Sequence, residues 1–440
     1  MALKGIDIFK MSPKKNCKEC GVPTCMAFSM KVAAGALPIE KCPYMGADVI
    51  AKLSEATAPP MKTIKVGDLS MGGETVMYRH EKTFVSKTLY AVSVSDTQEN
   101  ADEVFEELKK VDYERIGERE YAEFVFVKHD GDTDVFVEMA KKAAATGRQV
   151  ILDVDCPVCA EAALEAIKDA KPVLNGANAE NVEKMNELAG KYGVVLGVKA
   201  EGLDALYDLT AKIEKMGNKN LILNASTASV KEAFAETVQI RRAAVKNTDR
   251  TFGYPVLVNT AALAPGDQAM QTALASLFTM RYGSIIVMES MSYAQALPLF
   301  GLRQNVFTDP QKPMKVDPGI YPLNGATEDS PCVITVDFAL TYFLVSGEIE
   351  RSGVPVNLLI SDAGGYSVLT AWAAGKLSAS TIAKFIKEAD IGSKIKNRTL
   401  ILPGKVAVLK GEVQEKLPDW NVIVGTREAV ELVQFLKEFK

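Results

Sequence analysis

Between residues 88 and 300 the chain repeats short apolar runs, most of them followed by a longer stretch of helical periodicity. The runs have the length and apolar character of strands buried on both faces. They lie at Leu89–Val94, Phe124–Val127, Val150–Val154, Pro172–Leu174, Val194–Val198, Leu221–Leu223, Pro255–Val258 and Ile285–Met288. Eight βα units in succession predict a (β/α)8 TIM barrel. Because the fourth run is the weakest, a seven-unit or open doubly wound sheet remains an alternative.

The stretches between the runs place apolar residues at i, i+3 and i+4, the spacing of a helix with one buried face. The clearest are Ala101–Lys110, Val135–Ala145, Glu161–Ala170, Val182–Lys191 and Ala228–Val245. Helices of this length are the crossover connections that a parallel sheet needs.

Two proline-rich stretches divide the chain. Ala58–Pro60 cannot continue a helix, so it separates residues 1–57 from a β-rich stretch in which TIKVGDL, ETVMYRH and KTFVS predict short strands. Residues 301–331 contain five prolines and no periodicity. We therefore predict linkers at 58–87 and 311–329, on either side of a barrel at 88–310.

Beyond the second linker, residues 330–440 alternate strand-like and helix-like segments. Strands are predicted at Cys332–Val336, Val356–Ser361, Thr399–Leu402, Ala407–Leu409 and Val422–Val424, and helices at Ala339–Arg351, Tyr366–Ala374, Ser380–Ala389 and Arg427–Glu438. This alternation predicts a small doubly wound α/β domain, in which ligands bind where the carboxyl ends of strands meet loops.

Composition narrows the function classes. The N-terminus lacks the apolar stretch of a signal peptide, and no later run approaches the eighteen or so apolar residues of a membrane span, so we expect a cytoplasmic protein. The formal net charge is −5 and Lys and Arg form no long basic stripe, which argues against nucleic acid as a partner.

Four of the seven cysteines lie in the first tenth of the chain. Cys17, Cys20, Cys25 and Cys42 have the spacing C-x2-C-x4-C-x16-C, and Pro43 follows the last of them. Four thiolates hold either a [4Fe–4S] cluster or a Zn²⁺ ion. Zn²⁺ sites more often use two symmetric C-x2-C turns, so the unequal spacing with a terminal Cys-Pro favours the cluster, with zinc as the alternative.

The remaining cysteines are less informative. Cys156 and Cys159 form a C-x-x-C pair at the end of the third predicted barrel strand. They are either a redox dithiol or two ordinary core thiols. Cys332 begins a predicted strand, where a cysteine serves as a packing residue.

The segments PKKNCKECGVPTC and AFSMKVAAGALPIEKCPY, together with SDAGGYSVLTAWAAGKL, closely resemble the large (gamma) subunit of the corrinoid iron–sulfur protein of the reductive acetyl-CoA (Wood–Ljungdahl) pathway. The resemblance covers the whole chain. It implies a [4Fe–4S] module, a TIM barrel and a C-terminal corrinoid-binding α/β domain. It further implies a methyl carrier, in which a Co(I) corrinoid accepts a methyl group and the cluster reactivates Co(II).

Asp362, Ala363 and the glycine pair Gly364 and Gly365 follow a predicted strand and open a helix. Paired glycines let a backbone approach a flat ligand closely, although an ordinary βα turn has the same sequence. The resemblance favours the ligand. It implies that Tyr366, Ser367, Val368 and Thr370 line the lower face of the corrin, with Thr370 facing cobalt as the catalytic residue. Candidates for the nucleotide tail are Thr335, Thr341, Gly404, Gly425 and Thr426.

The only histidines are His80 and His129, and the D-x-H-x-x-G motif of many corrinoid domains is absent. We therefore expect a base-off corrinoid without a histidine ligand, which favours an electron-rich cobalt.

The resemblance implies a heterodimer with a smaller subunit, and exchange with a methyltetrahydrofolate methyltransferase and with acetyl-CoA synthase/CO dehydrogenase. Two other functions remain open. One is an iron–sulfur electron-transfer protein that activates a separate corrinoid protein. The other is a pterin-dependent methyltransferase, which would use the polar residues that end the barrel strands, namely Lys128, Asp155, Lys199, Asn224, Asn259 and Glu289.

Overall fold

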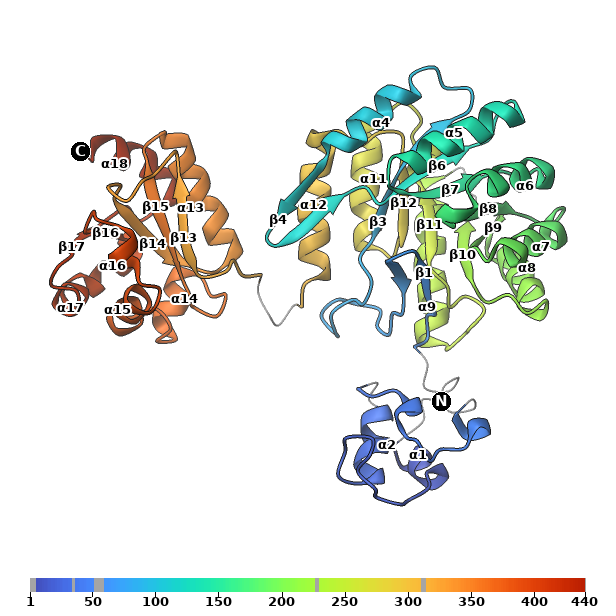
Figure 1. Ribbon diagram of the computed structural model, residues 1–440, viewed down its shortest axis with the longest axis horizontal. Helices are drawn as coiled ribbons and strands as arrows, with labels where there is room; N and C mark the ends of the chain where they lie inside the picture. The colour runs from blue at the N-terminus through green and yellow to red at the C-terminus, as the bar shows by residue number, and fades with distance from the viewer. Residues whose placement is uncertain (1–4, 34–35, 51–58, 226–228, 310–313, 440) are drawn as a thin grey trace. The chain divides into compact units, whose positions relative to one another are not determined.

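The computed structural model describes residues 5–33, 36–50, 59–225, 229–309 and 314–439 (Figure 1). The chain divides into two compact units: residues 1–113 with 120–307, and residues 114–119 with 308–440. Ala58 and residues 311–313 of the two predicted linkers lie outside the described residues, as does the start of the helix predicted from Ala228. None of the helices in the described residues has the length and apolarity to span a bilayer.

Eight parallel strands close into a barrel in the first unit. They are β3 (Leu89–Ser95), β6 (Phe124–Lys128), β7 (Gln149–Asp153), β8 (Val173–Ala177), β9 (Leu196–Ala200), β10 (Leu221–Ala225), β11 (Val256–Asn259) and β12 (Ile285–Met288). Each pairs with its neighbours in chain order, and β12 closes on β3. The predicted eight-unit barrel is confirmed, including the weak fourth strand, and the open-sheet alternative is wrong.

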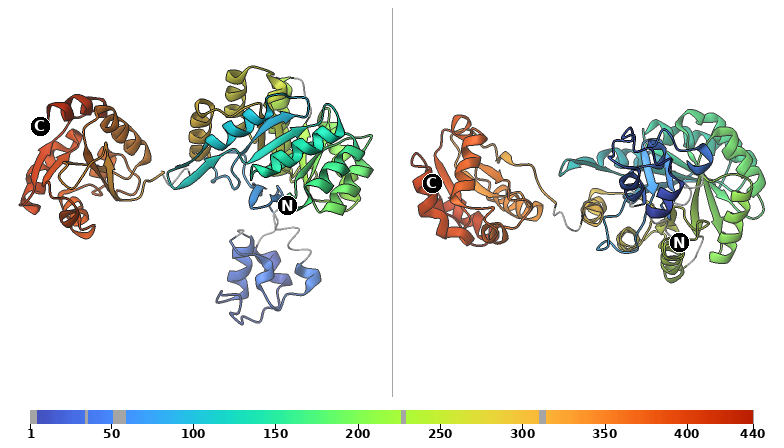
Figure 2. Two further views of the ribbon diagram at one scale, coloured as in Figure 1. Left: turned by 45° about the horizontal axis from the view of Figure 1, so that its top comes forward. Right: turned by 90° about the horizontal axis from the view of Figure 1, so that it is seen from below.

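Helices lie outside the barrel strands, as the two views of Figure 2 show. They are α4 (Ala101–Lys110), α5 (Thr133–Ala145), α6 (Pro157–Ala166), α7 (Val182–Tyr192), α8 (Leu203–Lys215), α9 (Val230–Lys246), α10 (Thr260–Leu263), α11 (Gln268–Met280) and α12 (Tyr293–Phe307), with a 3-10 turn η2 (Lys168–Ala170). The strands are buried on both faces because helices pack on the outside and side chains fill the inside, which explains their continuous apolar runs.

Two short hairpins are separate from the barrel sheet. β1 (Thr63–Val66) pairs antiparallel with β2 (Leu69–Gly72), and Ile64, Val66 and Met71 of this hairpin belong to the barrel core. The predicted β stretch after residue 60 is thus present, but ETVMYRH and KTFVS form no strand. The second hairpin, β4 (Asp112–Arg115) with β5 (Glu118–Tyr121), was not predicted, because its strands are largely charged.

The N-terminal segment forms a small module around its own apolar core. It consists of α1 (Gly5–Met11), α2 (Cys25–Ala33) and the 3-10 turn η1 (Ile39–Lys41). Its buried side chains include Ile8, Phe28 and Ile39, together with Cys20 and Cys42. Cysteines thus form part of the core of a segment that is too short to bury a large one.

The second unit is a five-stranded sheet in the order β13-β15-β14-β16-β17. The strands are β13 (Gly319–Leu323), β14 (Cys332–Val336), β15 (Val356–Ser361), β16 (Thr399–Leu402) and β17 (Asn421–Val424), and all are parallel except the edge strand β13. Strand order reverses between β14 and β16, the switch point at which α/β sheets of this kind bind ligands.

Helices cover both faces of this sheet, so the predicted doubly wound arrangement is confirmed. The apolar core on one face of the sheet includes side chains of α14 (Val368–Ala373), α15 (Ala379–Glu388), α16 (Ile391–Lys394) and α17 (Lys410–Lys416). The core on the other face includes side chains of α13 (Ala339–Ser352) and α18 (Leu432–Glu438). Two predictions were wrong. Ala407–Leu409 belongs to a 3-10 turn, η3 (Gly404–Leu409), and the predicted linker 311–329 contains β13. A further 3-10 turn is η4 (Ala429–Glu431).

Candidate cluster and corrinoid sites

The four N-terminal cysteines line one small cavity together with residues of the loop before α2. Cys17 is partly exposed, whereas Cys20, Cys25 and Cys42 are buried, and all are free thiols. Cys25 begins α2 and Cys42 follows η1, so two helical elements and one loop position the thiols. The structure thus brings the four predicted ligand residues together at one cavity.

The loop that carries Cys17 and Cys20 is held in an unusual backbone conformation. Asn16 has a positive φ of 49° and Gly21 one of 77°. The Asn16 side chain accepts a hydrogen bond from the Cys25 backbone N–H at 2.8 Å, and the Asn16 N–H donates to Cys25 Sγ at 3.4 Å. A backbone N–H aimed at a cysteine sulfur is a contact that tunes iron–sulfur clusters.

No three Cys, His, Asp or Glu side chains in the described residues converge on a point that could hold one metal ion. The four cysteines line one cavity, and a [4Fe–4S] cluster is held by four Cys thiolates. The donor set therefore fits a cluster.

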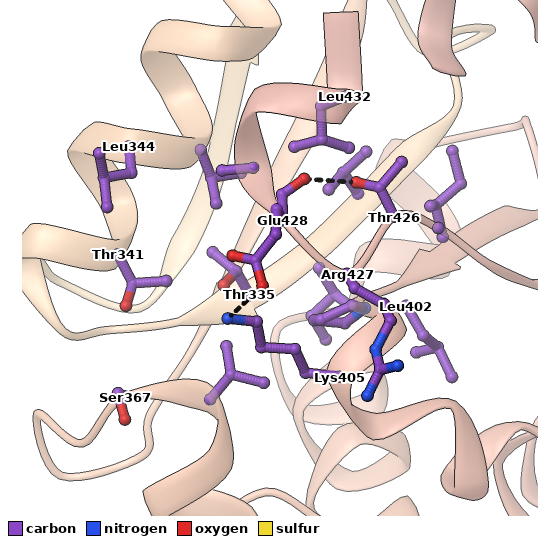
Figure 3. A pocket seen from close by; sticks show the side chains of 18 of the residues that line it. Thr335, Thr341, Leu344, Ser367, Leu402, Lys405, Thr426, Arg427, Glu428 and Leu432 are labelled. Carbon is purple, nitrogen blue, oxygen red and sulfur yellow. Dashed lines mark hydrogen bonds and ion pairs between the residues drawn. The ribbon is translucent and has the colours of Figure 1, made fainter. Parts of the chain in front are cut away.

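A second cavity, of about 230 Å³, lies at the carboxyl ends of β14, β16 and β17 (Figure 3). It is the switch point of the sheet, and its wall is more apolar than polar. Six of the residues predicted to contact the corrinoid line it, namely Thr335, Thr341, Ser367, Val368, Gly425 and Thr426. Segments nearly one hundred residues apart in sequence thus meet at one pocket.

The other predicted residues stand outside the wall of this pocket. Gly364 and Gly365 form the loop before α14, and both have a positive φ, 70° and 78°. Tyr366 and Thr370 are exposed, and the Thr370 hydroxyl hydrogen bonds with that of Ser367 at 2.9 Å. Gly404 has a different role, since a Cβ there would lie 2.7 Å from the backbone oxygen of Gly425.

Thr335 is the most informative residue in the pocket wall. It is 2% exposed at the end of β14, and its Oγ1 has no hydrogen-bond partner among the described residues. A buried hydroxyl without a partner costs free energy. A ligand that donates or accepts one hydrogen bond at this point would recover that cost.

Residues 13–44 match a family model described as a putative Fe-S cluster, and residues 65–436 match one described as the CO dehydrogenase/acetyl-CoA synthase delta subunit. The corrinoid/iron–sulfur protein large subunit of Moorella thermoacetica is 38% identical over 445 residues, which cover 99% of each chain. This chain belongs to the corrinoid/iron–sulfur protein large-subunit family. The resemblance carried by the cysteine motif is thereby confirmed.

Proteins named as gamma subunits of an acetyl-CoA decarbonylase/synthase complex are also similar over nearly the whole chain. The acetyl-CoA decarbonylase/synthase complex subunit gamma of Methanopyrus kandleri is 33% identical, covering 99% of this chain and 98% of that protein. Among solved structures, dihydropteroate synthase from Thermus thermophilus aligns with a TM-score of 0.40 at 14% identity, over 56% of this chain and 99% of that chain.

Three polar residues at or near the C-terminal site were not predicted from the sequence. Asp337 is fully buried directly after β14, and its carboxylate accepts hydrogen bonds from the N–H groups of Ala363 and Gly365 at 2.9 and 3.0 Å. Lys405 and Glu428 form an ion pair at 3.0 Å on the pocket wall (Figure 3). The available signal was their position, because polar residues just after parallel strands gather at one edge of the sheet.

Most of the six polar residues predicted at the ends of the barrel strands make local contacts. Lys199 lies 3.8 Å from Asp155, the Asn259 side chain accepts a hydrogen bond from the Ala262 N–H and so caps α10, and Glu289 accepts one from the Gly266 N–H. These contacts are typical of a scaffold and give the alternative of a pterin-dependent methyltransferase no support.

Proposed function

We propose that this chain is the methyl-carrying subunit of acetyl-CoA synthesis, with a corrinoid in the C-terminal domain and a [4Fe–4S] cluster in the N-terminal module. The proposal rests on family membership over the whole chain. The observation that carries it is the pocket at the switch point of the sheet, which six of the predicted residues line.

In this proposal the C-terminal residues bind and orient the corrinoid. The pocket would take its nucleotide tail, with the Thr335 hydroxyl as a hydrogen-bonding group. Leu344 and Leu369 line the same pocket and are 55% and 47% exposed, so they would give a flat macrocycle an apolar surface. The hydroxyl pair of Ser367 and Thr370 would face its lower side.

No histidine lies in residues 330–440, so this domain has no imidazole to offer as a lower ligand. When bound, the corrinoid would supply a cobalt that accepts and donates a methyl group, and the cluster would supply single electrons that restore its reduced state. Cys17, Cys20, Cys25 and Cys42 would hold that cluster, and the Asn16 N–H would stabilise the Cys25 thiolate.

The proposed partners follow from the family. Relatives are named as subunits of an acetyl-CoA decarbonylase/synthase complex. We propose a heterodimer with the small corrinoid iron–sulfur protein subunit, methyl supply from a methyltetrahydrofolate methyltransferase, and methyl delivery to acetyl-CoA synthase/CO dehydrogenase.

The substitution Cys20→Ala tests the division of labour between the two sites. We expect this variant to bind corrinoid normally but to lose the reductive reactivation of Co(II). The cluster that would pass on the electron needs all four of its thiolates. Reactivation is followed by the visible spectrum after addition of a low-potential reductant protein. Cys156→Ala, which also removes a thiol but outside the module, should reactivate like the unmodified protein. Unchanged reactivation in Cys20→Ala would remove the cluster from the mechanism.

A further inference from the structure

Cys156 and Cys159 lie in direct sulfur–sulfur contact at the carboxyl end of β7. Their Sγ atoms are 2.6 Å apart, with the Cys159 thiol donating to Cys156. Cys156 is the N-cap of α6 and Cys159 lies in its first turn, so the pair is three residues apart on a helix. That separation brings side chains within the distance that a disulfide requires.

The two thiols have different environments. Cys156 is partly exposed, and its Sγ also accepts a hydrogen bond from the Cys159 backbone N–H at 3.4 Å. These contacts, the Cys159 thiol above all, lower the pKa of Cys156. Cys159 is 8% exposed, accepts a hydrogen bond from the Thr133 hydroxyl at 3.3 Å, and has its pKa raised by burial. A thiolate-forming outer cysteine beside a buried one is the arrangement of disulfide-exchange sites.

We infer that Cys156 and Cys159 form a reversible dithiol/disulfide couple that exchanges two electrons with an external disulfide. The inference is independent of the proposed methyl-carrier function. Val158, between the two cysteines, is 76% exposed and leaves the Cys156 side of the helix terminus open to a partner.

The exchange balances in two steps. The Cys156 thiolate attacks one sulfur of the external disulfide, whose S–S bond breaks, and the leaving sulfur takes up a proton. Cys159 then loses its proton and attacks Cys156 Sγ, which forms the Cys156–Cys159 bond and releases the second external thiol. The pair is oxidised by two electrons and the external disulfide is reduced to two thiols.

Cys332 provides a contrast within the same chain. It is also a free thiol, but it is fully buried in β14, and burial raises its pKa to about 12. It therefore has the properties of an inert packing cysteine, and it serves as the internal control.

The test uses the full-length protein, purified without oxygen and with its metals in place. In one series it is equilibrated in glutathione buffers from fully reduced to fully oxidised, and in a second series with oxidised thioredoxin. The samples of both series are then quenched in acid, alkylated and digested with trypsin. Both cysteines fall in one peptide, residues 149–168, because cleavage follows Arg148 and Lys168. The disulfide form is lighter than the dithiol form by two hydrogen atoms and carries no alkyl group.

We expect the ratio of disulfide to dithiol in this peptide to change about tenfold for each thirty-millivolt step in buffer potential, as a two-electron couple requires. Dithiothreitol should reverse the oxidation of Cys156 and Cys159, and Cys332 should stay reduced at every buffer potential. A response to either oxidant supports the couple, and the two series distinguish a small-molecule partner from a protein. A dithiol peptide at every ratio in both series, or oxidation that dithiothreitol does not reverse, would overturn the inference.

Two single variants test the assigned roles. In Cys159→Ser a mixed disulfide with glutathione should accumulate on Cys156, about tenfold more than on Cys159 in Cys156→Ser, because only Cys156 is both exposed and thiolate-forming. Equal trapping on the two cysteines would contradict this order of attack. Thermal unfolding of both variants checks that each retains its fold.

Discussion

Among single residues, Thr335 matters most to the proposed corrinoid site, because its buried hydroxyl has no hydrogen-bond partner among the described residues. A buried hydroxyl at the end of a strand is destabilising unless something binds it. Valine has the same shape without the oxygen and is favoured in strands. The threonine therefore costs stability in the free protein, and the explanation that we propose is a contact with a ligand.

Thr335→Val tests this explanation. The free protein should be as stable as before or more stable by up to about 1 kcal/mol, while corrinoid affinity should fall about tenfold through loss of one hydrogen bond. Thermal unfolding and corrinoid titration measure the two effects. Thr260→Val is the control, because the Thr260 hydroxyl is buried but donates to the Val287 carbonyl at 2.6 Å. That change should destabilise the barrel and leave corrinoid binding unaffected. A destabilised Thr335→Val with normal affinity would refute the explanation.

At the scale of elements, the loop between β15 and α14 is held by a strand that is not its neighbour in sequence. Asp337 follows β14, lies fully buried, and accepts hydrogen bonds from two N–H groups of the loop, with Lys315 at 3.5 Å as a counter-ion. Within this loop, Gly364 donates its N–H to Asp362 at 3.0 Å, which lowers the pKa of Asp362. Asp337 thus fixes the glycine-containing loop that precedes the proposed corrin-facing residues.

Asp337→Asn should destabilise this unit by about 2 kcal/mol, because hydrogen bonds to a buried charge are stronger than neutral ones and the amide group would oppose an N–H donor. Differential scanning calorimetry measures the change. Asp362→Asn, in the same loop but with an exposed side chain, should change stability by less than about 0.5 kcal/mol. Equal effects of the two substitutions would show that Asp337 does not hold the loop.

Strands buried on both faces could be predicted from the sequence, whereas several partly exposed segments could not. The barrel strands and β14 to β16 are continuous apolar runs because helices or side chains cover both faces. The edge strand β13 is only partly buried and contains Pro322, so it resembles a linker. The run Ala407–Leu409 is apolar, but Val408 is 72% exposed in a 3-10 turn. A short apolar run in the sequence therefore does not distinguish a buried strand from an exposed 3-10 turn.

The residues of the candidate sites also differ in how far the sequence could predict them. The four cysteines could be predicted because ligand spacing is local in sequence and few residue types bind metal. That Thr335, Gly425 and Thr426 meet at one pocket could be predicted from their positions at strand ends. Asp337, Lys405 and Glu428 also follow strand ends, but their partners could not be predicted, since these depend on which loops the folded sheet brings together.

For the whole molecule, the proposed function requires two redox-active groups in one polypeptide, a cluster in the N-terminal module and a corrinoid in the C-terminal domain. Family membership covers both parts and the barrel between them in sequence. Each part has its own apolar core. The groups that would contact a cofactor differ accordingly. They are thiolates in the N-terminal module and hydroxyl, amide and apolar groups in the C-terminal domain.

Metal analysis of the protein purified without oxygen tests this account most directly. We predict about four iron atoms per chain, as a [4Fe–4S] cluster requires, together with one corrinoid cobalt and no stoichiometric zinc. Zinc in place of iron, with cobalt absent, would contradict it.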